Sequence, residues 1–359
     1  MHQRSLRIAR LLFALLSFTL CGTGIEATAF ASPAPSEARV VKTGAKKHST
    51  VRKAKTRRYS ARASRSRRAR LARARAAARA RQWSEASEPR FKKGADGEMV
   101  PDIRAAAAII YDPETNEVLW EENSQDSRSI ASITKVMTAA VLFEGNPDLT
   151  REVLIERADV SHANHTYLRA GERVSIDDLL HLTLVASDNA AARALARTSA
   201  LGSAGFIARM NEKARELGLE HTSYADPSGL DSNNVSSAYD MARLISFAAG
   251  DERLASVMRK SNHTVLTSRR VINIHSTNQL VMKGDVDVLG GKTGFISKAG
   301  YCLATLLRLP QSGQHVAVVV LGARSNAGRF METRHLFNWL SSKGSVNLVA
   351  GEATPAPQN

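Results

Sequence analysis

The order of apolar patterns along the chain predicts an α/β protein of the α+β kind, in which helices pack against an antiparallel sheet. A strand hairpin comes first, at 105–120. Helical patterns follow between 132 and 245, and strand-like runs with a final amphipathic helix occupy 271–340. Because the first hairpin must return to the last strands to complete one sheet, we expect a single interwoven unit with a helical subdomain.

The strand predictions rest on short apolar runs that turn residues separate. The runs 105–111 and 117–120 flank Asp-Pro-Glu-Thr-Asn, which is typical of a turn, and together they predict the hairpin. Later in the chain, three short apolar runs predict strands at the centre of the sheet, at 271–274, 301–307 and 316–321.

Helices are predicted where apolar residues recur at spacings of three and four between capping residues. Ser175, three residues before Asp178, forms a capping-box pattern at the start of one helix. Gly-Asn-Pro at 145–147 and Gly218 end two others. The predicted helices cover 132–143, 175–182, 189–196, 204–217, 237–245 and 330–340.

The positive charge of the chain is concentrated in one segment. Residues 42–93 contain 20 lysines and arginines and two glutamates. With so few large apolar side chains, 32–98 cannot offset its ordering entropy, so we expect a disordered Arg/Ala-rich linker. Two interpretations of its charge stay open, a solvated linker and an electrostatic contact with an anionic envelope surface. Nucleic acid is not expected as a partner if the chain is exported, which its first residues indicate.

The first residues have the pattern of an export signal. Three arginines precede the apolar run 11–20, and Ala-Phe-Ala at 29–31 offers a cleavage site. The run is too short to span a bilayer. The pattern predicts a signal peptide over 1–31, and a lipoprotein signal ending at Cys21 is the weaker alternative. Removal of 1–31 leaves Cys302, in a predicted buried strand, as the remaining cysteine.

Ser132 and Lys135 lie three residues apart, on one face of the helix predicted from 132. A serine hydroxyl becomes an effective nucleophile when a neighbour takes its proton, and a lysine can do so only when it is neutral. Burial and a second cation lower the pKa of a lysine, and Lys292 is the candidate for that cation. The alternative for this pair alone is an N-cap serine with a surface lysine.

A second motif, Ser187-Asp188-Asn189, falls between two predicted helices. In a loop at this position, Ser187 can relay a proton to a leaving nitrogen. Asn189 can hydrogen-bond a substrate amide or hold Lys135. The alternative is a simple helix cap.

A third motif, Lys292-Thr293-Gly294, opens an apolar strand. Lys292 and Thr293 can bind a carboxylate through charge and hydroxyl, and Gly294 permits close backbone approach. The backbone amides of Ser132 and of Phe295, the next residue along, are candidate donors to an oxyanion. The alternative is a lysine in a solvated turn.

We predict neither a metal nor an organic cofactor from the sequence. His162 and His165 lie three residues apart, but no acidic residue or cysteine near them in the sequence completes a metal site. There is also no glycine-rich loop of the kind that cradles phosphates.

The segment 131–139 resembles the active-site segment of the low-molecular-mass penicillin-binding proteins, the serine D-alanyl-D-alanine peptidases of family S11. Further stretches at 171–172, 190–192, 226–230 and 292–302 agree with that family. The resemblance implies a DD-peptidase/β-lactamase-like fold over 99–345 and a flexible tail over 346–359. It also implies a mechanism in which Ser132 is acylated and Lys135 accepts its proton. Ser187 would assist and Lys292 would bind substrate.

Within the family the chain looks most like the D-alanyl-D-alanine endopeptidases, which cut peptidoglycan cross-links in the periplasm. The carboxypeptidase members usually carry an extra all-β domain, and few residues follow Lys292 here. Peptidoglycan peptides are then the substrate and β-lactams the inhibitors. Three alternatives stay open: a DD-carboxypeptidase, a β-lactamase, and a non-catalytic peptidoglycan-binding protein. The stretch 226–240 lacks the glutamate that one class of β-lactamase uses for deacylation.

Overall fold

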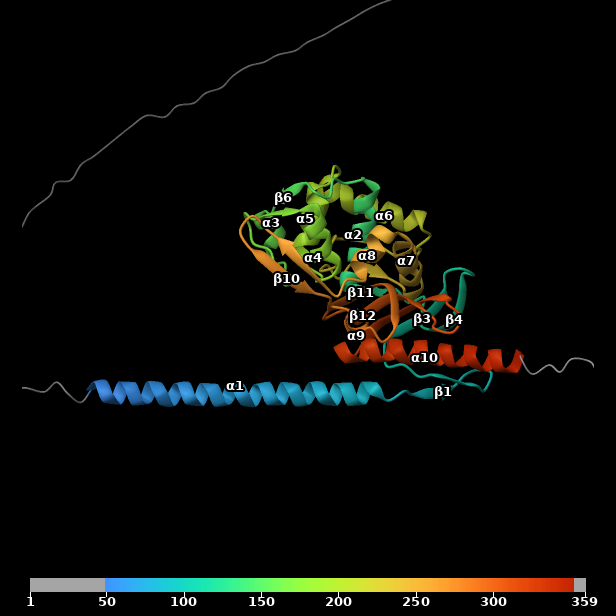
Figure 1. The fold of residues 1–359 in the computed structure, drawn as a ribbon, viewed down its shortest axis with the longest axis horizontal. Helices are drawn as coiled ribbons and strands as arrows, with labels where there is room; N and C mark the ends of the chain where they lie inside the picture. Colours follow the sequence, from blue (N-terminus) through green and yellow to red (C-terminus); the bar gives the residue numbers. More distant parts are fainter. Residues whose placement is uncertain (1–48, 352–359) are drawn as a thin grey trace, which may run out of the picture. The chain divides into compact units, whose positions relative to one another are not determined.

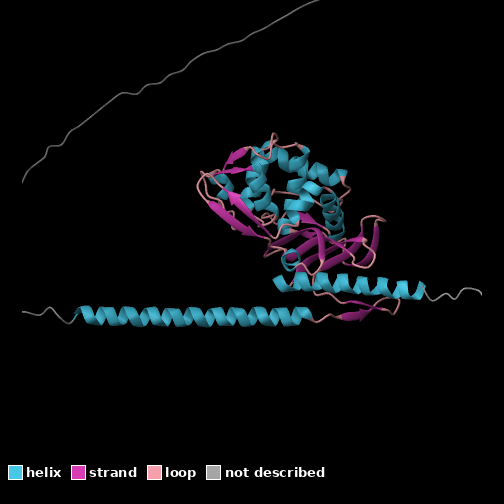
Figure 2. Cartoon of the chain, viewed as in Figure 1, coloured by secondary structure: helices cyan, strands magenta, loops and turns pink. Residues whose placement is uncertain are grey.

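The computed structural model describes residues 49–351, and the predicted signal peptide over 1–31 lies outside them. The chain divides into two units, Met1–Ser66 and Arg67–Asn359, and of the first only the beginning of helix α1 (Ser49–Ser87) is described. The second unit contains a five-stranded sheet (Figures 1 and 2). Its strands, all antiparallel to their neighbours, are in spatial order β11 (Asp287–Ile296), β12 (Gly300–Arg308), β13 (His315–Ala323), β3 (Ala107–Asp112) and β4 (Glu117–Glu122).

The pairing of β13 with β3 confirms that the first hairpin returns to the last strands. Both faces of the sheet are covered, which explains the continuous apolar runs of its inner strands. Leu306 and Val319 belong to the core shared with helix α7 (Ala238–Gly250). The side chains that precede and follow inward-facing residues in each strand point to the other face of the sheet. On that face, apolar side chains pack with helix α10 (Asn326–Gly351), which lies along the sheet in Figure 1.

The helical subdomain is built around α2 (Thr134–Glu144). Every side chain of α2 from Thr134 to Phe143 is buried, which fits a helix that other elements surround on all sides. Helices α4 (Ile176–Leu184), α5 (Asn189–Thr198), α6 (Gly202–Glu216) and α7 pack around it. Ser175 caps α4 by accepting a hydrogen bond from the Asp178 amide at 3.0 Å, as the capping-box pattern predicts.

Shorter elements connect these parts. The remaining strands pair two by two: β1 (Phe91–Lys93) with β2 (Met99–Pro101), β5 (Arg128–Ser129) with β8 (Val235–Ser236), β6 (Glu152–Leu154) with β7 (Arg173–Ser175), and β9 (Asn262–Leu266) with β10 (Val271–His275). The remaining helices are η1 (Ala131–Ile133), α3 (Arg157–Val160), α8 (Glu252–Met258) and α9 (Gln279–Lys283).

The structure differs from the sequence analysis in three places. The run 271–274 is not a central strand, because Asn273 and His275 alternate with Ile272 and Ile274 and leave β10 buried on one face only. From residue 49, the segment 32–98 contains the helix α1, since alanine and arginine are strong helix formers, and the strand β1. The helix α10 continues to Gly351, past the start predicted for the tail.

Between residues 49 and 351, no helix combines the length and the apolar character that are needed to cross a bilayer.

Candidate active site

Ser132 lies in the 3-10 turn η1, directly before α2. Lys135, in the first turn of α2, donates a hydrogen bond from Nζ to Ser132 Oγ at 2.9 Å. The Lys135 side chain is fully buried, and its ammonium has two more acceptors, Asn189 Oδ1 at 2.6 Å and Ser228 O at 2.5 Å. The alternative of an N-cap serine with a surface lysine is therefore excluded.

Burial lowers the pKa of Lys135 to about 7, because the charged amine loses its hydration. The carboxylates of Asp188 and Asp226 act in the opposite direction and favour the charged form. Near neutral pH roughly half of the Lys135 side chains are then uncharged and able to accept a proton. The geometry and the charge state together suit Lys135 as a base for Ser132.

Ser187 occupies the loop between α4 and α5 with a left-handed backbone, φ 60°. Its Oγ accepts a hydrogen bond from Lys292 Nζ at 2.8 Å. Lys292 is 1% exposed and also donates to Thr293 O at 2.9 Å. Burial lowers the pKa of Lys292 well below its usual value, and the charges of Lys135 and Arg329 lower it further. Each of the two serines therefore has a buried lysine as its partner.

Asn189 is the first residue of α5, and its side chain makes two hydrogen bonds. Nδ2 donates to Ala163 O at 2.7 Å, and Oδ1 accepts from Lys135 Nζ. Asp188 is the N-cap of α5 and is fully buried. Its second carboxylate oxygen accepts from Thr166 Oγ1 at 2.9 Å, within the loop that also holds Ala163. The motif is thus a helix cap and an active-site wall at the same time.

The strand β11 forms the edge of the sheet that faces Ser132. A Cβ atom on Gly294 would lie 2.6 Å from Ile130 O and 3.2 Å from Ser132 N, so only glycine fits there. Thr293 Oγ1 shares a hydrogen bond of 2.6 Å with Thr277 Oγ1. Gly294 therefore brings the third motif into contact with the first.

A cleft of about 580 Å³ opens over these groups. Lys135 and Lys292 do not line it, but each holds a serine that does. The other six predicted site residues all line the cleft, which is bounded by Ser132, Asn164, His165, Ala186, Ser187, Asn189, Leu230, Thr277, Thr293, Gly294, Phe295, Ile296, Ser297 and Arg329.

The sequence profile of the D-alanyl-D-alanine carboxypeptidases matches residues 94–325. The chain belongs to the D-alanyl-D-alanine carboxypeptidase family, the S11 peptidases. A D-alanyl-D-alanine endopeptidase of Haemophilus influenzae is 32% identical over 255 residues, covering 69% of this chain and 87% of that protein. The corresponding endopeptidase of Escherichia coli is 30% identical and covers 72% of this chain and 81% of that protein.

Solved structures of S11-like enzymes agree with the fold. The DD-transpeptidase of Streptomyces K15 superposes with a TM-score of 0.62 at 27% identity, covering 67% of this chain and 97% of that one. A D-alanyl-D-alanine carboxypeptidase of Mycobacterium tuberculosis superposes with a TM-score of 0.63 over 70% of this chain, and at 24% identity it shows the fold alone. The family and the fold predicted from the sequence are confirmed, and the chain is a serine D-alanyl-D-alanine peptidase by family.

Several residues of this S11 site have no role in the sequence prediction. The stretch 226–230 resembles the family, but its use becomes visible only here: Ser228 O accepts from Lys135, and Gly229, with φ 80°, lets Ala131 O approach. A Cβ on Gly229 would lie 2.1 Å from that oxygen. No spacing rule links 228 to 135, so only folding reveals this contact.

Two further residues at the cleft were also missed. The His165 ring contacts Ala186 O through Nε2 at 3.1 Å, and the His165 carbonyl accepts from the Asn189 amide at 3.1 Å. Arg329 of α10 donates to Gly294 O at 2.9 Å. Both side chains hold the backbone of a motif, a function that leaves no local pattern in the sequence.

Proposed function

We propose that this chain is a serine DD-endopeptidase that hydrolyses peptide cross-links of peptidoglycan through an acyl-enzyme on Ser132. The observation that carries the proposal is the 2.9 Å hydrogen bond between Ser132 Oγ and the Nζ atom of the fully buried Lys135. The similarity to the endopeptidases of H. influenzae and E. coli supports the choice of the bond that is cut.

In the acylation step, neutral Lys135 accepts the hydroxyl proton while Ser132 Oγ attacks the carbonyl carbon of the D-alanyl residue. The amides of Ser132 and Phe295 stabilise the oxyanion that forms. The C–N bond then breaks, and the leaving amine takes the proton from Lys135 by way of Ser187. The product is an ester on Ser132 and a free amine.

In the second step, water attacks the ester carbonyl and gives its proton to Lys135, which returns one to Ser132 as the carboxylate leaves. Lys292 and Thr293 bind the carboxylate of the substrate through charge and hydroxyl. The β11 edge pairs with the extended peptide, and Gly294 lets its backbone approach.

The proposal is tested with purified protein, cross-linked muropeptide dimers and pentapeptide monomers. Cleavage of dimers to monomers by the wild type, and its loss in Ser132→Ala, is the expected result. Release of free D-alanine with intact dimers would reject the endopeptidase in favour of a DD-carboxypeptidase. That alternative has support of its own, because relatives from Bacillus subtilis and E. coli are named carboxypeptidases.

A fluorescent penicillin separates the remaining alternatives. We expect a long-lived covalent adduct on the wild type and none on Ser132→Ala. Rapid turnover of the label would instead indicate a β-lactamase. A wild type that takes no label would favour a non-catalytic peptidoglycan-binding protein.

Export to the periplasm and contact of the basic segment with an anionic envelope surface are further parts of this proposal. In the described part of the segment the arginine side chains from Arg67 to Arg75 are exposed, so their charge is available to a partner. The two interpretations differ in salt dependence, because added salt screens exposed charges and weakens an electrostatic contact.

This part is tested by sedimentation of the mature protein with isolated cell envelopes over a salt series. The test variant replaces Arg67, Arg68, Arg70, Arg73 and Arg75 by glutamine, and Lys→Arg changes at 92 and 93 serve as a charge-conserving control. We expect weaker, less salt-dependent binding in the test variant alone. Equal binding of all three proteins would leave the segment a solvated linker.

A further inference from the structure

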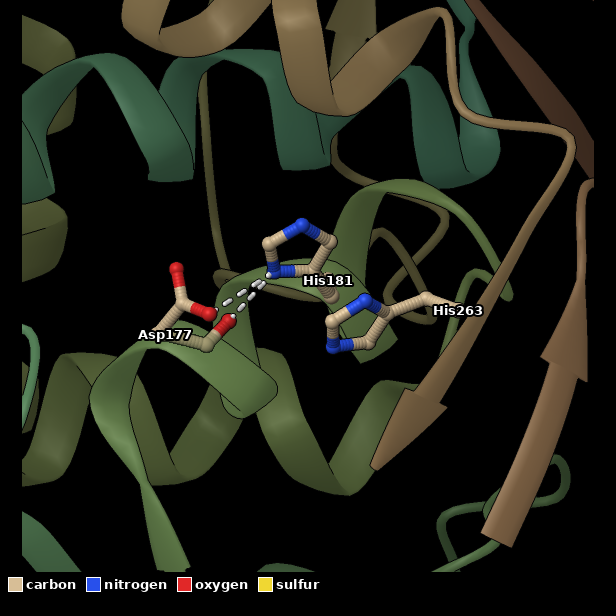
Figure 3. A group of neighbouring side chains, drawn as sticks. All are labelled: Asp177, His181 and His263. Carbon is tan, nitrogen blue, oxygen red and sulfur yellow. Dashed lines mark hydrogen bonds and ion pairs between the residues drawn. The ribbon is translucent and has the colours of Figure 1, made fainter. Parts of the chain in front are cut away.

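A second cluster of chemistry-bearing side chains lies between helix α4 and strand β9, away from the residues that line the catalytic cleft. Asp177 and His181 stand one helical turn apart on α4. His263 comes from β9, and its ring stacks on that of His181 with centroids 3.8 Å apart (Figure 3). One potential ligand atom from each of the three residues lies within 4.8 Å of the others.

We propose that Asp177, His181 and His263 form a binding site for a divalent transition-metal cation of the zinc type. Imidazole nitrogen and carboxylate oxygen are the donor atoms that zinc takes alongside thiolate. Asp177 Oδ2 and His181 Nδ1 are 3.5 Å apart. Two ligands of a tetrahedral zinc, each about 2.0–2.1 Å from the metal, are separated by roughly 3.3 Å. This pair therefore already has almost the spacing that the ion requires.

The surroundings of His263 support the site independently. Its Nε2 contacts Asp178 Oδ1 at 2.8 Å, which leaves Nδ1 as the ligand atom. Asp178 is itself held, because its other oxygen accepts from the Leu266 amide at 3.0 Å. A carboxylate on the second ring nitrogen is the common outer shell of a metal-binding histidine, since it fixes the tautomer and raises basicity.

Three features must change when the ion binds. His181 Nδ1 contacts the backbone oxygen of Asp177 at 2.9 Å, so it must give up this hydrogen bond and its proton to coordinate a metal. Lys260 Nζ lies 2.8 Å from His181 Nε2, and its charge opposes a cation on the same ring. The Lys260 side chain is exposed, so it can move into solvent. The two rings are nearly parallel, at 13°, and a metal lies in the plane of each imidazole that it binds. One of the two rings must therefore turn, and Lys260 competes with the ion.

The bound ion would join two elements that continue into the catalytic cleft. Helix α4 ends at Leu184, shortly before Ser187. Strand β10, which pairs with β9, ends at His275, and Thr277 beyond it contacts Thr293. The ion would thus act as a clamp behind two walls of the cleft. The sequence analysis considered only His162 and His165 as a possible metal pair. His181 and His263 are too far apart in the sequence for a spacing rule to pair them.

The test uses the full mature chain after treatment with a chelator, with Zn²⁺ as the probe and a chromophoric chelator as competitor. We expect one equivalent of tightly bound zinc at pH 7.5. His263→Gln and Asp177→Asn should each weaken binding by at least tenfold, and Asp178→Asn by about 10–100-fold. Exposed His221 provides the control, because His221→Gln should bind zinc like the wild type.

Lys260→Gln supplies the sharpest test, because removal of the competing ammonium should tighten zinc binding while other losses of contact would weaken it. Co²⁺ in place of zinc should give the visible spectrum of a tetrahedral site in the wild type and not in His263→Gln. Fluorescent-penicillin labelling of every variant shows that it is folded. Zinc affinity that is unchanged in both His263→Gln and Asp177→Asn, or weaker in Lys260→Gln, would overturn the proposal.

Discussion

The state of the Lys135 amine should govern how acylation of Ser132 depends on pH. Burial places the pKa of Lys135 at about 7, so its neutral fraction is about 0.1 at pH 6 and about 0.9 at pH 8. Because only the neutral amine accepts a proton, the acylation rate should rise about tenfold between these two values and then level off. An unburied lysine, with a pKa near 10.4, would still be rising at pH 9.

The measurement is the second-order rate constant for fluorescent-penicillin labelling from pH 5.5 to 9, with Lys135→Arg as the perturbation. Arginine keeps the charge but does not lose its proton in this range, so labelling should fall by about 10²–10⁴. Lys283→Arg changes an exposed lysine and should label like the wild type. A rate that stays flat from pH 6 to 8, or Lys135→Arg labelling at the wild-type rate, would refute the assignment of the base.

Three further predictions follow from individual contacts. Gly229→Ala should lower both the unfolding temperature and the labelling rate, because the new Cβ would meet Ala131 O. Gly313 is the control, because it has a similar φ of 72° but lies in open space. Gly313→Ala should lower the free energy of unfolding by only about 1–2 kcal/mol and leave labelling unchanged. Equal labelling in the two would contradict this argument. Ser187→Ala should slow acylation by about 10²–10⁴ while the unfolding temperature barely changes, and an unaltered rate would remove Ser187 from the proton path. His165→Ala should slow acylation, whereas His165→Gln keeps a donor for Ala186 O and should retain most of the wild-type acylation rate. Equal rates in the two variants would show that the ring does not position the Ser187 loop.

The sequence predicted the parts of the site that are local or that resemble a family. Ser132 and Lys135 are one helical turn apart, so their contact follows from local geometry. Ser187 and Lys292 lie 105 residues apart, and the resemblance of their motifs predicted that both belong to the site but not that they contact each other. Ser228, which holds Lys135 through its carbonyl, could not be predicted, because any residue type offers that atom.

The errors in the fold have a common physical origin. The run 271–274 contains enough isoleucine and valine for a central strand, but whether a strand is covered on both faces depends on what packs against it. Helix α1 is the opposite case, because its segment is poor in large apolar residues. Alanine and arginine still favour a helix there, since helix propensity does not require an apolar face that packs against a core. In both segments local composition indicated how apolar the chain is, while the tertiary environment decided the structure.

The two buried lysines have different electrostatic surroundings. Lys135 has the carboxylates of Asp188 and Asp226 to stabilise its charge, whereas Lys292 is influenced by Lys135 and Arg329, which both disfavour a proton. A substrate carboxylate beside Lys292 reverses this balance, because an opposite charge at close range raises the pKa of an amine. The cation that lowers the pKa of Lys135 is Arg193, and not Lys292 as predicted from the sequence. The surroundings of the two lysines therefore suit Lys135 to proton transfer near neutral pH and Lys292 to binding a carboxylate.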